Sequence, residues 1–138
     1  MIKKQLIHDE GDVPHAYQDS LGYWTIGVGF LIDKRKGGRI PEPVIDFWLQ
    51  YEIREKRSEL IASLPWFTKL DDARQGVLLN MAFNLGTTGL LSFKKTLALV
   101  ESGKYSDAAK EMLNSRWANQ VGKRADRLSR QMQTGQWV

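Results

Sequence analysis

The sequence predicts a mainly helical α+β fold, in which a long helix joins a small N-terminal lobe to a larger helical C-terminal lobe. Three observations carry this prediction. Glycines and alternating apolar residues between Tyr17 and Gly29 are typical of short strands and tight turns. Apolar residues at helical spacing dominate the chain after Pro65. Residues 41–63, between these regions, are rich in charge and predict a long helix, which is called the joining helix below.

The N-terminal region predicts one short helix followed by strands. Apolar spacing predicts a helix over residues 2–10, and Gly11 is a natural stop for it. Strands are expected at Tyr17–Asp19 and Tyr23–Val28, because a turn signal separates them. A third short strand is expected at Arg39–Ile40.

The joining helix is expected to begin after Pro41 and to run to about Ser63, because Pro65 stops it. Its middle is highly charged and its two ends are apolar, as in a helix whose ends pack into different lobes. An ordinary amphipathic surface helix has nearly the same pattern. Both interpretations therefore stand on the pattern alone.

The first helix of the C-terminal region is expected to run from a cap at Asp71 or Asp72 to about Leu85. Gly86 is expected to end it, with a loop over residues 86–89. Apolar side chains cover most of its circumference, which predicts a helix buried in the centre of the larger lobe.

Three residues near this helix carry further expectations. Asn80 is expected to be a buried polar group that needs hydrogen-bond partners. Gly76 costs about 1 kcal/mol against alanine in a helix interior, so close packing is expected there. Trp137 is expected to pack back on the core.

Further helices are expected in the remaining sequence. One should run from about Phe93 to Gly103, and Ser106 should cap the next. A last helix is expected over residues 123–133, with Gly135 as its stop, and Trp117 should anchor the turn before it.

Composition predicts one compact domain over residues 1–138. The chain has no cysteine, which excludes disulfides and cysteine-based zinc sites. Its histidines, His8 and His15, are interpreted as surface or packing residues rather than ligands. The N-terminus has no signal-peptide pattern and no stretch of about 20 apolar residues occurs, so accumulation in the cytoplasm of the producing cell is expected.

The net charge of +4 is moderate, but basic residues are enriched near the C-terminus. A basic patch attracts polyanions such as nucleic acid, anionic lipid headgroups or envelope polymers. A solvated helix face has the same pattern. The basic residues in question are Arg116, Lys123, Arg124, Arg127 and Arg130.

Two carboxylates lie on either side of the change from helix to strand. Glu10 is expected at a helix C-terminus, where the partial negative charge favours its protonated form. Asp19 comes next to a turn, where it should be solvated and ionised. Such a pair can divide into a proton donor and a base, and the Thr25 hydroxyl could orient a water between them. Solvated surface charges and turn caps remain the alternative on spacing alone.

Several groups of residues stand in an order that is specific when they are taken together. They are Glu10-Gly11, Tyr17-x-Asp19, Gly22-Tyr23-x-Thr25-Ile26-Gly27-x-Gly29, Asn80-Met81-x-Phe83-Asn84-x-Gly86, Ser115-Arg116-Trp117-x-Asn119-Gln120, Arg124-Ala125-x-Arg127 and Thr134-Gly135-x-Trp137. With these groups the chain resembles the bacteriophage T4-type lysozymes, a family of muramidases. The resemblance covers most of the chain and has a gap after Gly29.

The resemblance implies hydrolysis of the β-1,4 bond between N-acetylmuramic acid and N-acetylglucosamine in peptidoglycan, by an inverting mechanism. Glu10 would protonate the leaving oxygen, while Asp19 and Thr25 would hold a water on the opposite face of the sugar. Arg124 would lie near Glu10 and hold it in position. Its positive charge would also lower the pKa of Glu10 and so oppose the effect of the helix end, and the sequence does not decide between these two effects. The positions that would line the saccharide cleft are Leu31, Phe83, Asn84, Thr96, Glu111 and Arg116.

The resemblance also implies a lysozyme-like fold, with a small lobe at about 12–45 and a large lobe at about 1–11 and 60–138. It implies a monomeric phage endolysin that needs no metal or cofactor and binds no nucleic acid. Such an enzyme stays in the host cytoplasm until a holin permeabilises the membrane. It then degrades the periplasmic wall and lyses the host.

The chain departs from the family pattern at a few positions. Phe30 replaces a histidine that pairs with an acid, so that ion pair should be absent. Thr96 and Glu111 differ from the family residues, and Phe83 could equally be a core residue. The chain is also about twenty residues shorter than the family pattern, mostly between Gly29 and Pro41, which could open the cleft.

Three other functions fit part of the sequence. A lytic transglycosylase would cut the same bond without water and would not require Asp19. A non-catalytic wall-binding or tail-associated module would tolerate the loss of Glu10. A nucleic-acid-binding protein would use the basic C-terminal helices but leaves the glycine-rich segment unexplained.

Overall fold

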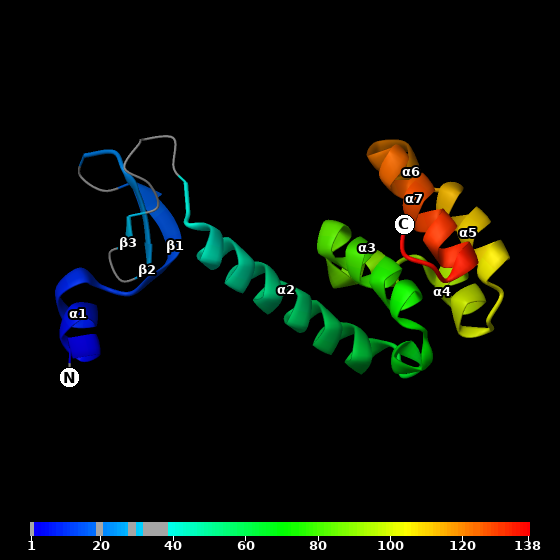
Figure 1. Ribbon diagram of the computed structural model, residues 1–138, viewed down its shortest axis with the longest axis horizontal. Helices are drawn as coiled ribbons and strands as arrows, with labels where there is room; N and C mark the ends of the chain where they lie inside the picture. Colours follow the sequence, from blue (N-terminus) through cyan, green and yellow to red (C-terminus); the bar gives the residue numbers. More distant parts are fainter. Residues whose placement is uncertain (1, 19–20, 28–29, 32–38) are drawn as a thin grey trace. The chain divides into compact units, whose positions relative to one another are not determined.

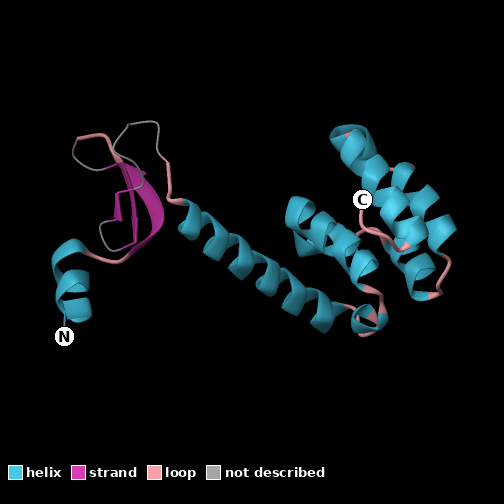
Figure 2. Ribbon diagram, viewed as in Figure 1, coloured by secondary structure: helices cyan, strands magenta, loops and turns pink. Residues whose placement is uncertain are grey.

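The computed structural model describes residues 2–18, 21–27, 30–31 and 39–138. The chain divides into two compact units, Met1–Leu49 and Gln50–Val138, which are called the N-terminal and C-terminal units below. Helices dominate the described residues and one small sheet lies near the N-terminus, so the mainly helical α+β prediction is confirmed (Figure 2). The finer assignment of residues 1–11 to the larger lobe stays a prediction.

The N-terminal unit contains a short helix and a three-stranded antiparallel sheet of order β1-β2-β3 (Figure 1). The predicted helix over residues 2–10 is confirmed. The elements are α1 (Ile2–Glu10), β1 (Val13–Gln18), β2 (Trp24–Gly27) and β3 (Phe30–Leu31).

Two strand predictions need correction. The third strand is not Arg39–Ile40 but Phe30–Leu31, which pairs with β2 through Ile26 and Thr25. At two residues, β3 is too short to show the alternation of apolar and polar residues from which a strand is predicted. The first strand begins at Val13 rather than Tyr17, because residues before Tyr17 are extended through an irregular register.

The predicted long helix is confirmed as α2 (Glu42–Ser63), and it contains the boundary between the two units. It begins directly after Pro41, whose carbonyl accepts from the backbone N–H groups of Val44 and Ile45. Its C-terminal part packs through Leu60, which is fully buried.

The C-terminal unit is helical throughout its described secondary structure. A short 3-10 turn, η1 (Phe67–Lys69), precedes the helices. The helices are α3 (Asp72–Leu91), α4 (Lys94–Glu101), α5 (Tyr105–Leu113), α6 (Arg116–Val121) and α7 (Lys123–Thr134).

Helix α3 begins as predicted, because the Asp71 carboxylate accepts from the backbone N–H of Arg74 at 3.1 Å. Gly86 does interrupt it, with φ 77° and ψ 159°. The predicted loop over residues 86–89 is wrong, however, because the chain returns to helical geometry and continues to Leu91. The burial of Leu90 anchors this continuation.

Of three predictions for single residues in the C-terminal unit, the structure contradicts two and confirms one. Asn80 is exposed rather than buried, because it lies on the face of α3 turned away from the core. Ser106 is not a cap, since α5 begins one residue earlier, at Tyr105. Gly76 is closely packed as expected: a Cβ there would lie 2.6 Å from Cζ3 of Trp137.

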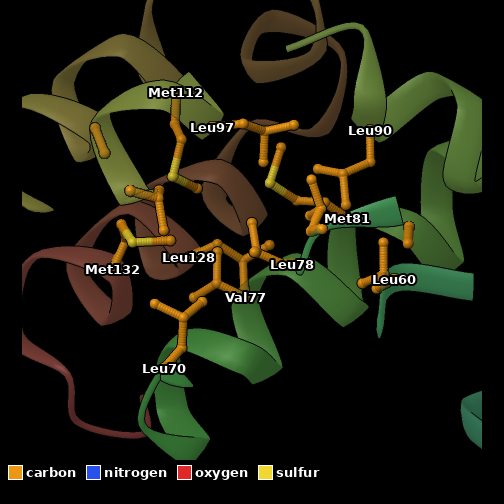
Figure 3. Packing of buried hydrophobic residues seen from close by; sticks show 14 of the residues in the cluster. Leu60, Leu70, Val77, Leu78, Met81, Leu90, Leu97, Met112, Leu128 and Met132 are labelled. Carbon is orange, nitrogen blue, oxygen red and sulfur yellow. The ribbon is translucent and has the colours of Figure 1, made fainter. Parts of the chain in front are cut away.

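One continuous core occupies the C-terminal unit. The side chains labelled in Figure 3 converge on Val77, Leu78 and Met81 of α3, each of them fully buried. The other labelled members are Leu60, Leu70, Leu90, Leu97, Met112, Leu128 and Met132. The central position predicted for α3 is therefore confirmed, although its circumference is not buried all round.

Candidate active site

All three predicted catalytic residues, Glu10, Asp19 and Thr25, belong to the N-terminal unit of the chain. Glu10 is the last residue of α1, where Gly11 has φ 79° and its N–H donates to the carbonyl of Ile7 at 2.9 Å. The helix therefore ends at the residue after Glu10, as the sequence predicts. Asp19 directly follows β1 and lies outside the described residues.

Thr25 lies in the central strand of the sheet. It is paired with Tyr17 on one side and with Leu31 on the other, and only 6% of its surface is exposed. Its hydroxyl donates to the carbonyl of Tyr23 at 3.3 Å. The oxygen therefore keeps its lone pairs, so a water held by Thr25 would donate to it rather than accept from it.

The register of β1 against β2 is irregular between Val13 and Tyr17, in the stretch that follows the end of α1. Val13 pairs with Gly27 and Tyr17 with Thr25, so β1 uses more residues than β2 over the same stretch. Pro14 lies in this stretch and lacks a backbone N–H, which suits an interrupted ladder. Bulges of this kind are common beside active sites, where they redirect side chains.

The C-terminal unit carries most of the predicted saccharide contacts, and three of them, Phe83, Asn84 and Arg116, are exposed as a ligand contact requires. Phe83 is 49% exposed although it lies on the largely buried α3, so the alternative that it is a core residue is wrong. Arg116 is exposed at the start of α6. Leu31, the contact predicted in the N-terminal unit, lies in β3.

Asn84 is held by a residue that the sequence analysis assigned only to a turn. The indole N–H of Trp117 donates to its side-chain oxygen at 2.9 Å. Trp117 is itself buried and meets Phe93 edge-on, with ring centroids 6.2 Å apart. Because the Asn84 oxygen accepts this bond, the orientation of the amide is fixed and its nitrogen is left as a donor. A buried tryptophan needs a hydrogen-bond acceptor for its N–H, and this requirement could have predicted a polar partner for Trp117.

Two other predicted contacts are engaged within the protein. Thr96 is 3% exposed and belongs to the buried side of α4. The Glu111 carboxylate lies 3.3 Å from the Lys95 ammonium, in an ion pair between α5 and α4. Both side chains are therefore less accessible to a sugar than Phe83 is.

Arg124 is fixed by Asn80. Its Nε and Nη2 atoms donate to the Asn80 side-chain oxygen at 2.9 and 2.7 Å. Two charge-assisted bonds to one acceptor hold the guanidinium in a single orientation. Asn80 therefore has the partner that the sequence analysis required, on the surface rather than in the core.

A pocket of about 170 Å³ adjoins this pair in the C-terminal unit. It is lined by Gly76, Asn80, Arg124, Arg127, Leu128, Gln131, Trp137 and Val138. Trp137 packs over Gly76 here, as predicted, but stays 69% exposed. The pocket combines two guanidinium groups with an exposed indole.

A hydrogen bond from the Thr87 hydroxyl to the Glu59 carboxylate ties α2 to the continuation of α3 after Gly86. This bond lowers the pKa of Glu59, and Lys56, 3.6 Å away, lowers it further. Arg57 adds a second tie between these helices by donating to the Gln75 side chain at 2.7 Å.

No three His, Asp or Glu side chains of the described residues group in a way that could hold a metal ion. In the same residues no single helix is long and apolar enough to cross a membrane; α3 and α4 together have that length and composition, with a bend of 101° between them.

The chain matches the family model described as phage lysozyme over residues 8–134. Two curated relatives from Dictyostelium discoideum, probable T4-type lysozymes 1 and 2, are each 33% identical over 160 aligned positions, which cover 97% of this chain and 94% of theirs. The pre-baseplate central spike protein Gp5 of Enterobacteria phage T4 is 26% identical, over 97% of this chain and 28% of its own. The alignments exceed the 138 residues of this chain, so these relatives have residues with no counterpart here.

Proposed function

The chain belongs to the phage lysozyme family and is a lysozyme-type glycoside hydrolase, and from this membership we propose that it cleaves the β-1,4 bond between N-acetylmuramic acid and N-acetylglucosamine in bacterial peptidoglycan. The observation that carries the proposal is the family match over residues 8–134, which includes Glu10, Asp19 and Thr25. The helix end at Gly11 and the central position of Thr25 in the sheet support it.

Glu10 is proposed as the general acid that protonates the leaving glycosidic oxygen. It stands at the C-terminus of α1, where the helix dipole disfavours a second negative charge and so favours the protonated acid. The proton must be present when the C–O bond breaks, because an alkoxide is a poor leaving group. From the family match we also propose that Arg124, whose guanidinium is held by Asn80, positions Glu10.

Asp19 and Thr25 are proposed to hold the attacking water. Asp19 would accept a proton from the water as the general base, and the Thr25 oxygen would accept its second hydrogen bond. In an inverting enzyme the two carboxyl groups are about 6.5–9.5 Å apart, which leaves room for this water. We propose that mechanism for Glu10 and Asp19.

Phe83, Asn84 and Arg116 are proposed to contact the glycan. Phe83 offers an exposed aromatic face, and Asn84 offers an amide donor that Trp117 orients. Arg116 follows the Ser115 cap of α6 and can meet the carboxylates of the wall. Leu31, Thr96 and Glu111 remain proposed contacts with less structural support.

The proposed biological role is host cell lysis by a phage endolysin. The family name supports this role, whereas the two T4-type relatives come from an amoeba. The enzyme would remain in the host cytoplasm until a holin permeabilises the membrane, and it would act as a monomer. The match to the phage T4 spike protein favours a second role, as a tail-associated lysozyme module.

Digestion of purified peptidoglycan, followed by mass spectrometry of the soluble fragments, tests the activity. The native protein should release fragments with reducing N-acetylmuramic acid ends, and Glu10→Gln and Asp19→Asn should release almost none. Anhydro ends would replace the proposal with a lytic transglycosylase. A folded native protein that releases no fragments would instead be a wall-binding module.

A further inference from the structure

An exposed ion pair joins the first turn of α4 to the last turn of α5. The Lys95 ammonium lies 3.3 Å from the Glu111 carboxylate, and 76% of the Lys95 side chain and 24% of the Glu111 side chain are exposed. Exposed pairs contribute little to folding, because water already solvates both charges and two long side chains lose freedom. A need for stability therefore does not explain this pair, and both side chains remain accessible in part. Lys95 and Glu111 are called the Lys–Glu pair below.

Aromatic contacts connect the Lys–Glu pair to two of the proposed glycan contacts. Phe93 directly precedes α4, and its ring meets the Trp117 indole edge-on. The same indole donates its N–H to the side chain of Asn84 at 2.9 Å. The first turn of α4, which carries Lys95, therefore lies close to the part of α3 that offers Asn84 and Phe83.

A short connection leads from the Lys–Glu pair to the third glycan contact. Glu111 is followed by Met112, whose carbonyl accepts a hydrogen bond from the Ser115 hydroxyl at 2.7 Å. Ser115 also caps α6, in which the exposed Arg116 is the first residue. Neighbours of the Lys–Glu pair thus make direct contacts that lead to Asn84 and to Arg116.

The charges of the Lys–Glu pair do not match a glycan strand. N-acetylmuramic acid and N-acetylglucosamine present hydroxyls and acetamides, and the lactyl carboxyl of the former is joined to the peptide as an amide. The charges of peptidoglycan are therefore on its stem peptides. Thr96, which follows Lys95, is 3% exposed, so its neutral hydroxyl is withdrawn from a sugar. The start of α4 thus offers charge to the peptide part of the substrate.

We propose that the Lys–Glu pair binds a stem-peptide side chain that ends in an ammonium and a carboxylate on one carbon, as in diaminopimelate. The Lys95 ammonium has three donors for the ligand carboxylate, and the Glu111 oxygens accept from the ligand ammonium. The four charges then alternate in sign around a ring. Each charge of the protein keeps its present partner and gains one from the ligand.

The proposal rests on the proposed function, because it takes peptidoglycan as the ligand, and it assigns a preference within that substrate. Crosslinking of the stem peptides converts the ligand ammonium into an amide and so removes its charge. The Lys–Glu pair therefore favours uncrosslinked stem peptides over crosslinked ones.

Calorimetric titration with disaccharide–tripeptides tests the proposal, since these fragments contain no bond that a muramidase cleaves. Three forms differ only in the third residue of the peptide. Diaminopimelate carries both charges, diaminopimelate acetylated at its free amine keeps only the carboxylate, and lysine keeps only the ammonium. Exposed ion pairs contribute up to about fivefold each, so the native protein should bind the diaminopimelate form about fivefold more tightly than either other form.

Two single substitutions separate the two charges. Lys95→Gln should remove the preference over the lysine form and keep the preference over the acetylated form, and Glu111→Gln should do the reverse. An ion pair with a merely structural role would change the affinity for all three forms by the same factor. The matched control is Lys104→Gln, which removes one charge from an exposed position before α5 and should keep both preferences.

Equal affinity of the native protein for the three forms would overturn the proposal, and so would an equal change for all three forms in both variants. The measurement does not depend on cleavage. A preference for the diaminopimelate form in a protein that digests no peptidoglycan would support the Lys–Glu pair and overturn the proposed function. Digestion of peptidoglycan without any such preference would do the opposite.

Discussion

The two units of this chain differ in what they contain. Every buried apolar residue among those described lies between Leu60 and Met132, in the C-terminal unit. The N-terminal unit has the helix end at Glu10 and the strand that carries Thr25, which is the one buried residue described there. The proposed chemistry and the hydrophobic stabilisation therefore belong to different parts of the sequence. Substitutions should separate accordingly into losses of activity and losses of stability.

The largest effect expected is on activity, from Glu10→Gln. The amide keeps the shape of the side chain but cannot donate the proton, and general acid catalysis contributes about 10²–10⁴-fold. Peptidoglycan digestion should slow by about 10³-fold while the midpoint of urea unfolding stays unchanged. Glu101→Gln, at the exposed end of α4, is the matched control and should do neither. A large loss of stability in Glu10→Gln would contradict the division between the units.

The largest effect on stability is expected from Leu78→Ala. Leu78 is fully buried in the centre of the core, where such truncations cost about 2–5 kcal/mol. The free energy of unfolding from urea titration should fall by about 3 kcal/mol, within the range for buried leucines. Leu113→Ala, at a 43% exposed position, should cost far less. Similar costs at both positions would show that the core is not packed as described.

A smaller loss is expected from Arg74→Met, which keeps an unbranched apolar stem but removes the guanidinium group and its donors. Arg74 donates to the carbonyls of Met132 and Gln133 at 2.7 and 3.0 Å, and its guanidinium lies 3.6 Å from the Tyr105 ring centroid. It thus joins the start of α3 to the end of α7 and to α5. Loss of these bonds should cost about 2 kcal/mol in urea unfolding. The outcome that would refute this role is an unchanged unfolding midpoint with Arg74→Met.

The smallest effect expected is a change in how stability depends on pH. The Thr87 hydroxyl holds the pKa of Glu59 below its ordinary value of 4.5. A lowered carboxylate pKa gives stability that is present above the unfolded pKa and is lost as pH falls through the folded one. Thr87→Val should therefore flatten the fall in thermal stability below pH 4.5. An unaltered pH profile in this variant would mean that the bond contributes nothing to folding.

The sequence predicted the elements whose signals are local. The bounds of α1, α2 and α7 follow from Gly11, from Pro41 and Pro65, and from Gly135, whose φ of 70° ends α7. The sequence did not predict the elements whose bounds depend on tertiary contacts. The chain resumes a helix after Gly86 because Leu90 reaches the core, and no local signal in Gly86–Gly89 indicates that.

The same difference between local signals and tertiary contacts applies to the candidate site. Glu10 and Thr25 are predicted site residues through motifs, because a family signature is read directly from the residues. The bond from Trp117 to Asn84 joins residues 33 positions apart, so only the folded chain reveals it. The burial of Thr96 did have a signal in the sequence, because Thr96 lies four residues before Val100 and so shares the apolar face of α4.

The position of the core late in the sequence has a consequence for synthesis on the ribosome. Residues 1–59 emerge before the first core residue, Leu60. At roughly 5–20 residues per second, the chain from Leu60 to Val138 takes about 4–16 s to follow. During that time the described apolar core of the C-terminal unit is incomplete. Immature chains should therefore be exposed to chaperones and proteases until translation is nearly complete.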